Sequence, residues 1–455
     1  MATSSVNLNN MGLNQGTVSS GSGIDVTSVV NQIIDSQRGP EKLWQQQQSN
    51  LTSQTNALNS LNSSLTALQT AMRALSDMSG VMSSNTATSS QTGILTASAQ
   101  SGASAGNHLI VVTNLATTSS TYSDAVATPD TPLQTGVITL QVGTASTDVT
   151  VDSTNNTLSA LASAINAQKL GVTASVITDA NGARLALVSN TTGAPGDLTV
   201  TGNIPGLGFH KSVTGQNASL TIDGVPISSA TNTVTGAING VTLNLVSAAP
   251  NTPVQLSVGP NTSAITTAVS NFVGTYNTVM TKINAQYAVD SATHTAGPLA
   301  SDVSLRSLQS SLLSDVTYAM SGNNGLTSLA ALGINMANDG TLSIDDAAFN
   351  NALENNFAGV QNFFQGATDG FGSHFSADLS ALTSPTQGVL NANLTEITNQ
   401  QKVLTDTISD FEDRLSAREQ QLIKQYSAID AMLRQYPLTL QSINAQLATL
   451  QNYQK

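Results

Sequence analysis

Residues 390–432 read LNANLTEITNQQKVLTDTISDFEDRLSAREQQLIKQYSAIDAM, and apolar side chains recur in them at alternating steps of three and four residues. This C-terminal stripe comprises Leu390, Leu394, Ile397, Leu404, Ile408, Phe411, Leu415, Leu422, Ile429 and Met432. A spacing near 3.5 residues is typical of a coiled-coil helix, which needs a partner helix to cover its apolar side. Polar residues at Gln401, Arg418 and Gln425 interrupt the seam, as register-setting positions do.

A second stripe near the other end of the chain offers that partner. It comprises Trp44, Leu51, Leu58, Leu61, Leu65, Leu68, Met72 and Leu75. Pairing the two stripes would bring the ends of the chain together and project the residues between them. The alternative is that both are ordinary core helices of a bundle. We predict a coiled-coil core made of Leu51, Leu58, Leu61, Leu65, Leu68, Leu394, Ile397, Leu404, Ile408, Phe411, Leu415, Leu422 and Ile429.

Between the stripes the pattern changes to short strands and turns. One unit combines a helix at 157–168 with two alternating runs around Asn181-Gly182, a strong hairpin signal. The predicted class is therefore α+β, with paired terminal helices and two inserted β-rich domains. The predicted boundaries are 43–80 with 264–436 for the helical domain, 81–120 with 218–263 for the first β-rich domain, and 121–217 for the second. The remaining segments, 1–42 and 437–455, are expected to serve assembly and to be disordered when free.

Two short amphipathic pieces lie at the extremes of the chain. The first is expected to be capped by Asp25 or Thr27 and to end at Gly39-Pro40, and Pro437 is expected to separate the last piece from the long helix. Helices this short are marginal in water, so they either fray or fold on a partner. We predict that their apolar residues contact assembly partners, namely Ile24, Val29, Val30, Ile33, Leu440, Ile443, Leu447 and Leu450.

Composition excludes several classes of protein. The net charge is -13 with only 14 basic residues in 455, which argues against nucleic acid as a partner. The absence of cysteine excludes disulfides, thiolate catalysis and Cys-ligated zinc. No apolar run is long enough for a signal peptide or a membrane span, so we expect no membrane partner and an export route without a cleaved signal.

The sequence shows no pattern of catalytic or metal-binding residues. His108, His210, His294 and His374 lie far apart, and we expect them to be solvated loop residues rather than a metal or catalytic set. The run from Asp339 to Asp346 lacks the ligand pattern of a calcium loop and is expected to be a turn into a capped helix. No catalytic residue, cofactor or metal site is predicted.

Several motifs resemble those of a known family. Residues 21–30, with the helix and Arg38-Gly39-Pro40 after them, resemble the N-terminal signature of the flagellar hook-associated protein 2 family of filament cap proteins. Residues 157–194 resemble the flagellin IN motif found in that family. The C-terminal region is similar through Gly297-Pro298-Leu299, Leu305-Arg306, Asp339-Gly340-Thr341-Leu342-Ser343, Phe363-Phe364 and Gly370-Phe371-Gly372. The chain departs from the family pattern at Ile24, where Leu is common, and at Ser301, where Gly is usual.

The resemblance implies a non-enzymatic axial protein that is exported unfolded by the flagellar type III apparatus to the tip of the bacterial flagellum, outside the cell. Its implied partners are further copies of itself in a ring, with a pentamer as one stoichiometry, flagellin, hook–filament junction proteins, and a flagellar export chaperone at the C-terminal region. Two alternatives stay open. One is another axial protein, either a junction protein or flagellin, and the other is an adhesin that binds host mucin or glycans through the β-rich domains.

Overall fold

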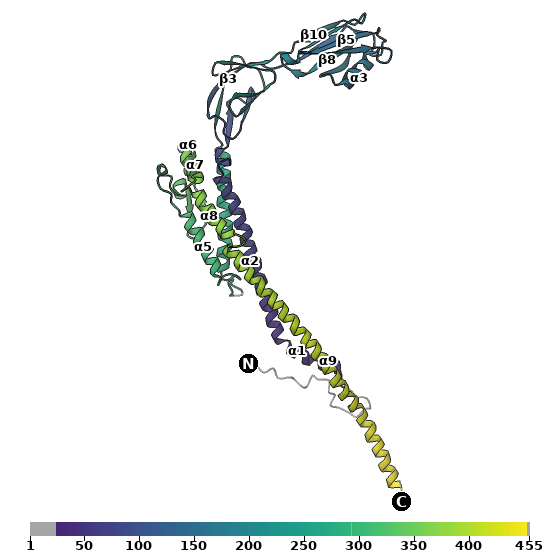
Figure 1. Cartoon of the computed structure of the whole chain (residues 1–455), viewed down its shortest axis with the longest axis vertical. Coiled ribbons are helices and arrows are strands. Elements are labelled where there is room, and N and C mark those ends of the chain that lie inside the picture. Colours follow the sequence, from purple (N-terminus) through teal and green to yellow (C-terminus); the bar gives the residue numbers. More distant parts are fainter. Residues whose placement is uncertain (1–23, 293, 453–455) are drawn as a thin grey trace.

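The helices come from the two ends of the chain and the long run of strands comes from its middle (Figure 1). The computed structural model describes residues 24–292 and 294–452, with side chains described as far as residue 448. Of the segments 1–42 and 437–455, which were expected to be disordered when free, residues 1–23 and 453–455 lie outside this range, as does the side chain of Leu450. The terminal helices are α1 Val26–Gln37, α2 Gly39–Ser76, α4 Thr262–Tyr287, α5 Val303–Val316, α6 Asp346–Asn355, α7 Phe357–Gln365, α8 Phe371–Thr383 and α9 Val389–Asn452.

Local sequence explains most helix starts. The Asp25 carboxylate accepts a hydrogen bond from the Ser28 amide (3.0 Å) and caps α1, as predicted. Arg38 separates α1 from α2, where Pro40 occupies the first turn and needs no amide hydrogen. The Asp339 carboxylate accepts a hydrogen bond from the Thr341 amide, and the Asp345 carboxylate caps α6. The predicted turn into a capped helix is therefore confirmed, with a short strand between the turn and the helix. That strand forms a small hairpin of β16 Ile334–Met336 and β17 Leu342–Ile344.

The helical core is a bundle in which α2 packs mainly against α4, α8 and α9. Lys282 of α4 donates to the Ser64 hydroxyl (2.8 Å), Gln69 donates to Ser380 of α8 (3.1 Å), and further along α2 contacts α9. The two stripes therefore do pair, but α4 and α8 cover much of the α2 side that the sequence assigned to α9 alone. Six buried phenylalanines complete this core, namely Phe272, Phe349, Phe363, Phe364, Phe371 and Phe375.

Two features of the C-terminal helices differ from the sequence prediction. Helix α9 continues through Pro437 without a break. Proline removes one backbone hydrogen bond, but a long solvated helix with intact turns on both sides can tolerate that loss. Helix α8 was missed because Gly370 and Gly372 read as helix breakers. A Cβ on Gly372 would stand 2.0 Å from the Phe364 carbonyl oxygen, so this glycine allows α8 to approach the end of α7 closely.

The first β unit is a sandwich built from strands on both sides of a large insertion. Its sheets have the orders β1-β15-β3-β11-β12 and β13-β14-β2, with antiparallel pairing throughout. Leu220, Leu243 and Leu256 are fully buried in the core between them. The strands are β1 Asn85–Ser89, β2 Leu95–Ala99, β3 Gly106–Asn114, β11 Ala218–Ile222, β12 Val225–Ser229, β13 Thr233–Ile238, β14 Val241–Leu245 and β15 Val254–Pro260.

The second β unit is inserted between β3 and β11. Its sheets have the orders β10-β4-β8-β7 and β6-β5-β9, and helix α3 Leu158–Gln168 packs on β7. The predicted hairpin is confirmed, since Asp179 pairs with Gly182 at its tip. The strands are β4 Thr118–Ser123, β5 Gly136–Val142, β6 Ala145–Val151, β7 Val172–Asp179, β8 Gly182–Thr192, β9 Leu198–Gly202 and β10 Phe209–Val213.

The three parts are nested along an elongated molecule. Figure 1 shows the first β unit at the upper end of α2, the second β unit beyond it, and α9 extending to the opposite end. The α+β class with paired terminal helices and two inserted β-rich units is thereby confirmed. The described residues also form the short 3-10 turns η2 Val81–Ser83, η3 Ala194–Gly196, η4 Asn323–Gly325 and η5 Ala330–Leu332. In the described part of the chain, no helix has both the length and the apolar character to span a bilayer.

Candidate assembly surfaces

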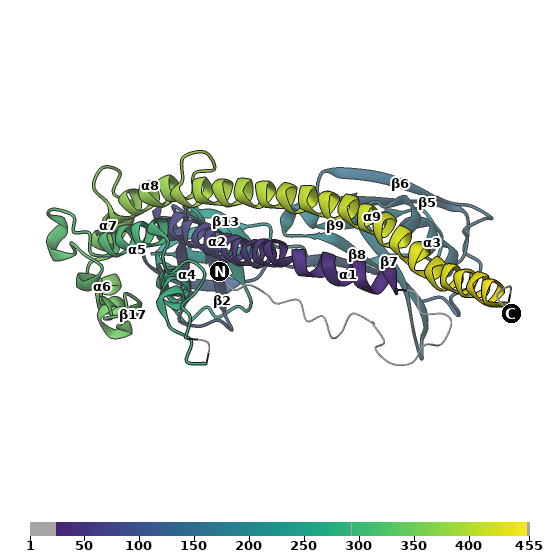
Figure 2. The same cartoon turned by 90° about the horizontal axis from the view of Figure 1, so that it is seen from below.

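The first part of α9 is covered by an antiparallel neighbour. Gln48 of α2 donates to Thr405 (3.0 Å), and Gln401 donates to Thr52 (3.4 Å). One step further along, the rings of Trp44 and Phe411 meet edge to face with centroids 5.2 Å apart. As α2 numbers fall, α9 numbers rise, so the two helices run in opposite directions (Figure 2).

Helix α1 continues the same antiparallel contact. Val30 and Ile34 pack against Leu415 and Leu422 in a small cluster separate from the main helical core. The contact ends at Ile24, whose amide donates to the Asp430 carboxylate (2.8 Å). Within the described residues, one long helix is thus paired first with α2 and then with α1, as far as Asp430.

From Ile429 onward, α9 carries an apolar side that stays largely exposed among the residues the structure describes. Its members are 43% to 65% exposed and recur at steps of four and three residues: Ile429, Leu433, Tyr436, Leu440, Ile443 and Leu447. These residues form a stripe along one side of the helix, as the seam of a coiled coil does. At 1.5 Å per residue the stripe is roughly 27 Å long. We call it the uncovered stripe.

The structure places the predicted assembly residues in two different environments. Val30 is buried against α9 and Ile33 is half-buried in the same contact, while Val29 is buried and Ile24 is half-buried. Leu440, Ile443 and Leu447 are 43%, 46% and 51% exposed. The N-terminal residues are therefore already covered inside the chain, and the C-terminal residues are not. That either set contacts a partner stays a prediction.

The predicted coiled-coil residues are distributed over both helical cores. Leu51, Leu58, Leu61, Leu65, Leu68, Ile397, Leu404, Leu415 and Leu422 are buried, and Leu394, Ile408 and Phe411 are half-buried. Ile429 differs, since it is 45% exposed. The reason is the length of the partner helix, because α1 begins at Val26 and its last contact with α9 is at Asp430.

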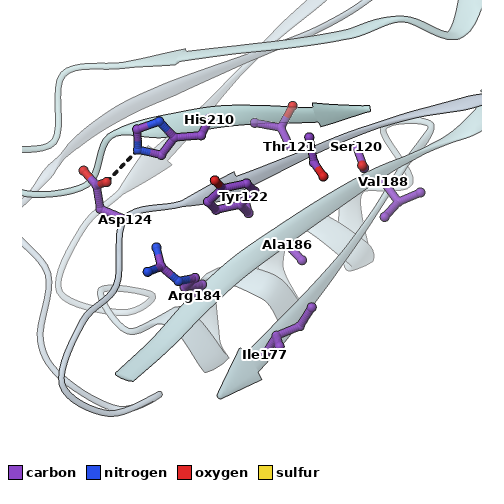
Figure 3. A pocket seen from close by; sticks show the side chains of 10 residues that line it. Ser120, Thr121, Tyr122, Asp124, Ile177, Arg184, Ala186, Val188 and His210 are labelled. Carbon is purple, nitrogen blue, oxygen red and sulfur yellow. Dashed lines mark hydrogen bonds and ion pairs between the residues drawn. The ribbon is translucent and has the colours of Figure 1, made fainter. Parts of the chain in front are cut away.

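A second surface lies on the outer face of sheet β10-β4-β8-β7. It is a shallow open groove of about 740 Å3, in which Figure 3 shows Tyr122 between Arg184 and His210. The Arg184 guanidinium lies 5.7 Å from the centroid of the Tyr122 ring, and the Tyr122 and His210 rings are 5.5 Å apart. His210 pairs with Asp124 at 2.7 Å, and this hydrogen bond, with a second from the Gly208 amide, lowers the pKa of the Asp124 carboxyl. The groove presents an aromatic and a cationic group to solvent.

Sequence reasoning missed this groove and misjudged three histidines. His108 lies in β3 and pairs with Asp223 at 2.7 Å, His210 lies in β10, and His374 lies in α8, whereas loops were expected. Each histidine has a partner aspartate that is either distant from it in the sequence or one helical turn away. The separation between the histidines themselves was therefore the wrong criterion for judging whether they are isolated. Strand β4 reads Thr-Ser-Ser-Thr-Tyr-Ser, with polar residues on both faces, so no local alternation marks the exposed face around Tyr122.

Comparison with known proteins confirms the resemblance seen in the sequence. Family models match residues 22–119 (flagellar hook-associated protein 2 N-terminus), 215–437 (flagellar hook-associated protein 2 C-terminus) and 137–191 (flagellin hook IN motif). The B-type flagellar hook-associated protein 2 of Pseudomonas aeruginosa PAO1 is 31% identical over 460 residues, covering 94% of this chain and 96% of that protein. The flagellar hook-associated protein 2 of Escherichia coli K12 is 30% identical, covering 91% and 94%.

A solved structure resembles most of the fold. The crystal structure of the D1-D2-D3 domains of the flagellar cap protein FliD from Escherichia coli aligns with a TM-score of 0.56 at 29% identity. The alignment covers 75% of this chain and 99% of that one.

Proposed function

Since this chain belongs to the flagellar hook-associated protein 2 family, we propose that it caps the flagellar filament, forming a ring at the tip where exported flagellin folds and inserts. The role is structural, with no catalytic step. The observation that carries the proposal is the uncovered stripe, because an apolar seam of coiled-coil spacing needs a partner helix to cover it.

The proposed partners follow from that role. They are further copies of this chain in the ring, flagellin and hook–filament junction proteins at the tip, and an export chaperone at the C-terminal region before assembly. The protein would act outside the cell at the distal end of the flagellum, after export without a cleaved signal. The acidic net charge is compatible with this location. None of the described helices could span a membrane.

The arrangement of the chain supports a division between a docking end and an outer end. Helices α1, α2 and the first part of α9 form a stiff paired segment, and the uncovered stripe extends it away from the β units (Figure 1). An amphipathic helix that projects beyond its own domain docks through anchors spaced like these, into a groove or beside another helix. The two β units would then face outward from the filament and line the space in which flagellin is received.

The names of the relatives favour the cap over the other axial proteins considered from the sequence, since the matched curated proteins are hook-associated protein 2 and the matched structure is a cap protein. None of these names supports an adhesin. The groove at Tyr122 is the surface on which a glycan would be sought.

A double substitution of the uncovered stripe tests the proposal. Leu440→Glu with Ile443→Glu places charges on the stripe without disturbing a buried contact, because both residues are exposed in the free chain. We expect the variant to fold and be exported, but cells relying on it to stop swimming and to release flagellin into the medium. Antibody labelling in electron micrographs should find the unaltered protein at the distal tip.

A matched control changes the charge equally on the opposite side of the same turns. Ser442→Glu with Ala445→Glu also alters exposed residues, and it should leave motility intact. Normal swimming with the double Leu440 and Ile443 variant, or labelling along the hook rather than at the tip, would show that the assignment is wrong.

A further inference from the structure

An aspartate occupies a core position in α5. Leu305, Leu308 and Leu312 form the buried side of this helix, and Asp315 takes the next position of the same stripe. Its side chain is 1% exposed, yet neither carboxylate oxygen has a hydrogen-bond partner among the described residues. Burial, and then the proximity of Asp378, raise the pKa of this carboxyl above its usual range. A buried carboxylate is normally paired with a cation or hydrogen-bonded, so this one calls for a compensating group.

Helix α8 presents two further ligand types to Asp315. His374 and Asp378 are one helical turn apart and share a side of α8. The nitrogen and the two carboxylate oxygens of the three residues all lie within 4.8 Å of one another. His374 Nδ1 is 3.6 Å from Asp315 Oδ1, which is too long for a hydrogen bond. Two ligands of a tetrahedral Zn²⁺, each at about 2.0–2.1 Å, stand roughly 3.4 Å apart.

The surroundings hold these groups in place. The Tyr318 ring stacks on His374 with centroids 4.3 Å apart, and its hydroxyl donates to the Asp369 carbonyl (2.9 Å). The Tyr276 hydroxyl from α4 is also buried without a hydrogen-bond partner among the described residues, and burial, followed by the nearby charge of Asp315, raises its pKa. Polar groups of α4, α5 and α8 thus come together at the edge of the bundle, where the His374 side chain is 38% exposed.

We propose that Asp315, His374 and Asp378 bind a first-row divalent transition metal, with Zn²⁺ the best match. One imidazole nitrogen and two carboxylate oxygens are the donor types of a three-ligand zinc site that keeps a position for water. The imidazole disfavours Mg²⁺ and Ca²⁺, which take oxygen ligands. The bound ion would cross-link α5 to α8 in a chain that has no cysteine and so cannot form a disulfide.

Metal titration of the full-length, untagged chain tests the proposal. The protein is stripped with a chelator, dialysed free of it, and titrated with ZnCl2 by calorimetry and with CoCl2 by visible absorption. We expect one Zn²⁺ per chain, a raised melting temperature, and a Co²⁺ spectrum of low coordination number. MgCl2 and CaCl2 should give no saturable heat.

Variants separate this site from general metal binding. Asp315→Asn and His374→Gln should each weaken Zn²⁺ binding by at least about tenfold. Removing a metal ligand weakens binding at least as much as removing a residue that orients a ligand. Asp378→Asn, at a half-buried position, should do the same, and it serves where Asp315→Asn fails to fold by circular dichroism. The control His210→Gln removes a histidine with only one aspartate partner, and it should bind Zn²⁺ as the parent does.

The result that overturns the proposal is equally specific. If Zn²⁺ does not bind in a saturable way, or if folded Asp315→Asn and Asp378→Asn bind it as tightly as the parent, the three residues form no metal site. The two carboxyl groups would then be stabilised by sharing a proton.

Discussion

Helix α9 contains two segments of the same heptad-like spacing in opposite situations. Up to Leu422 the residues of its C-terminal stripe are buried or half-buried against the neighbouring helices, and Leu390, Ile397 and Leu404 are buried. After Asp430 the same spacing continues, but Leu440 and Ile443 are almost half exposed. The spacing of a stripe therefore indicates that a helix needs a partner, but it does not indicate whether the partner belongs to the same chain. Among the described residues, the contact of α1 with α9 ends where Ile24 meets Asp430.

Truncating one buried leucine and one exposed leucine should give the largest contrast between the segments. Leu390→Ala removes a side chain that is 1% exposed, and we expect it to destabilise the helical region by about 3 kcal/mol through lost burial and a cavity. Leu440→Ala should change the free energy of unfolding by less than about 0.5 kcal/mol. Urea unfolding of the full chain, followed by helical circular dichroism, compares the two. Equal losses would mean that the uncovered stripe is packed in the free chain.

Replacing the proline inside α9 should strengthen the uncovered segment alone. Pro437→Ala restores one backbone hydrogen bond and removes a ring clash, an effect of up to about 3 kcal/mol in a helix interior. We expect slower hydrogen exchange at the amides around residue 437, with those before Asp430 unchanged as the internal control. If the amides around residue 437 exchange at the same rate in the parent and in the variant, Pro437 does not weaken this segment.

The contact at Asp430 marks the boundary between the segments and can be removed. Asp430→Ala deletes the acceptor of the Ile24 amide and the partner of Arg434 (2.8 Å), and we expect a loss of about 1 kcal/mol in the α1–α9 contact. Proteolysis at the start of α1 should become faster. Asp410→Ala, an exposed aspartate of the same helix, is the control, and a similar effect of both would deny a special role for Asp430.

The smallest expected effect comes from the start of α1. Asp25→Ala removes the cap that accepts the Ser28 amide, which should cost about 1 kcal/mol or less at this exposed helix end. The measurement is again protease sensitivity of α1, and Asp25→Asn should restore most of the resistance because its amide oxygen also accepts. If α1 stays attached to α9 in all three forms, the apolar contacts of Val30 and Ile34 alone fix it.

Sequence alone predicted the elements whose signals are local. The cap at Asp25, the turn at Asn181-Gly182 and the capped helix after Asp345 need only neighbouring residues, and all three are confirmed. The stripes of α2 and α9 were recognised by their period, and so was the nested α+β organisation.

The misses depend on residues that are close only in the fold. Gly372 is compatible with a helix because α7 and α2 crowd against it, which no local reading of Gly370-Phe371-Gly372 reveals. The share of α2 covered by α4 and α8 follows from the shape of the bundle rather than from heptads. His374 was dismissed although Asp378 stands one turn away, because Asp315 reaches it from another helix.

The nested connections also set an order of folding. The hairpin of β7 and β8 closes a short loop, the second β unit closes where Thr117 bridges to Gln216, and the first closes where Asn85 pairs with Pro260. Shorter loops cost less entropy to close, so we expect the innermost unit to form first and the helical bundle last. A chain delivered from its N-terminus would then hold α2 without helical partners until α4 and α9 arrive. Outside its single apolar stripe, α2 is rich in Gln, Asn, Ser and Thr, and these residues would keep the helix solvated until its partner helices fold.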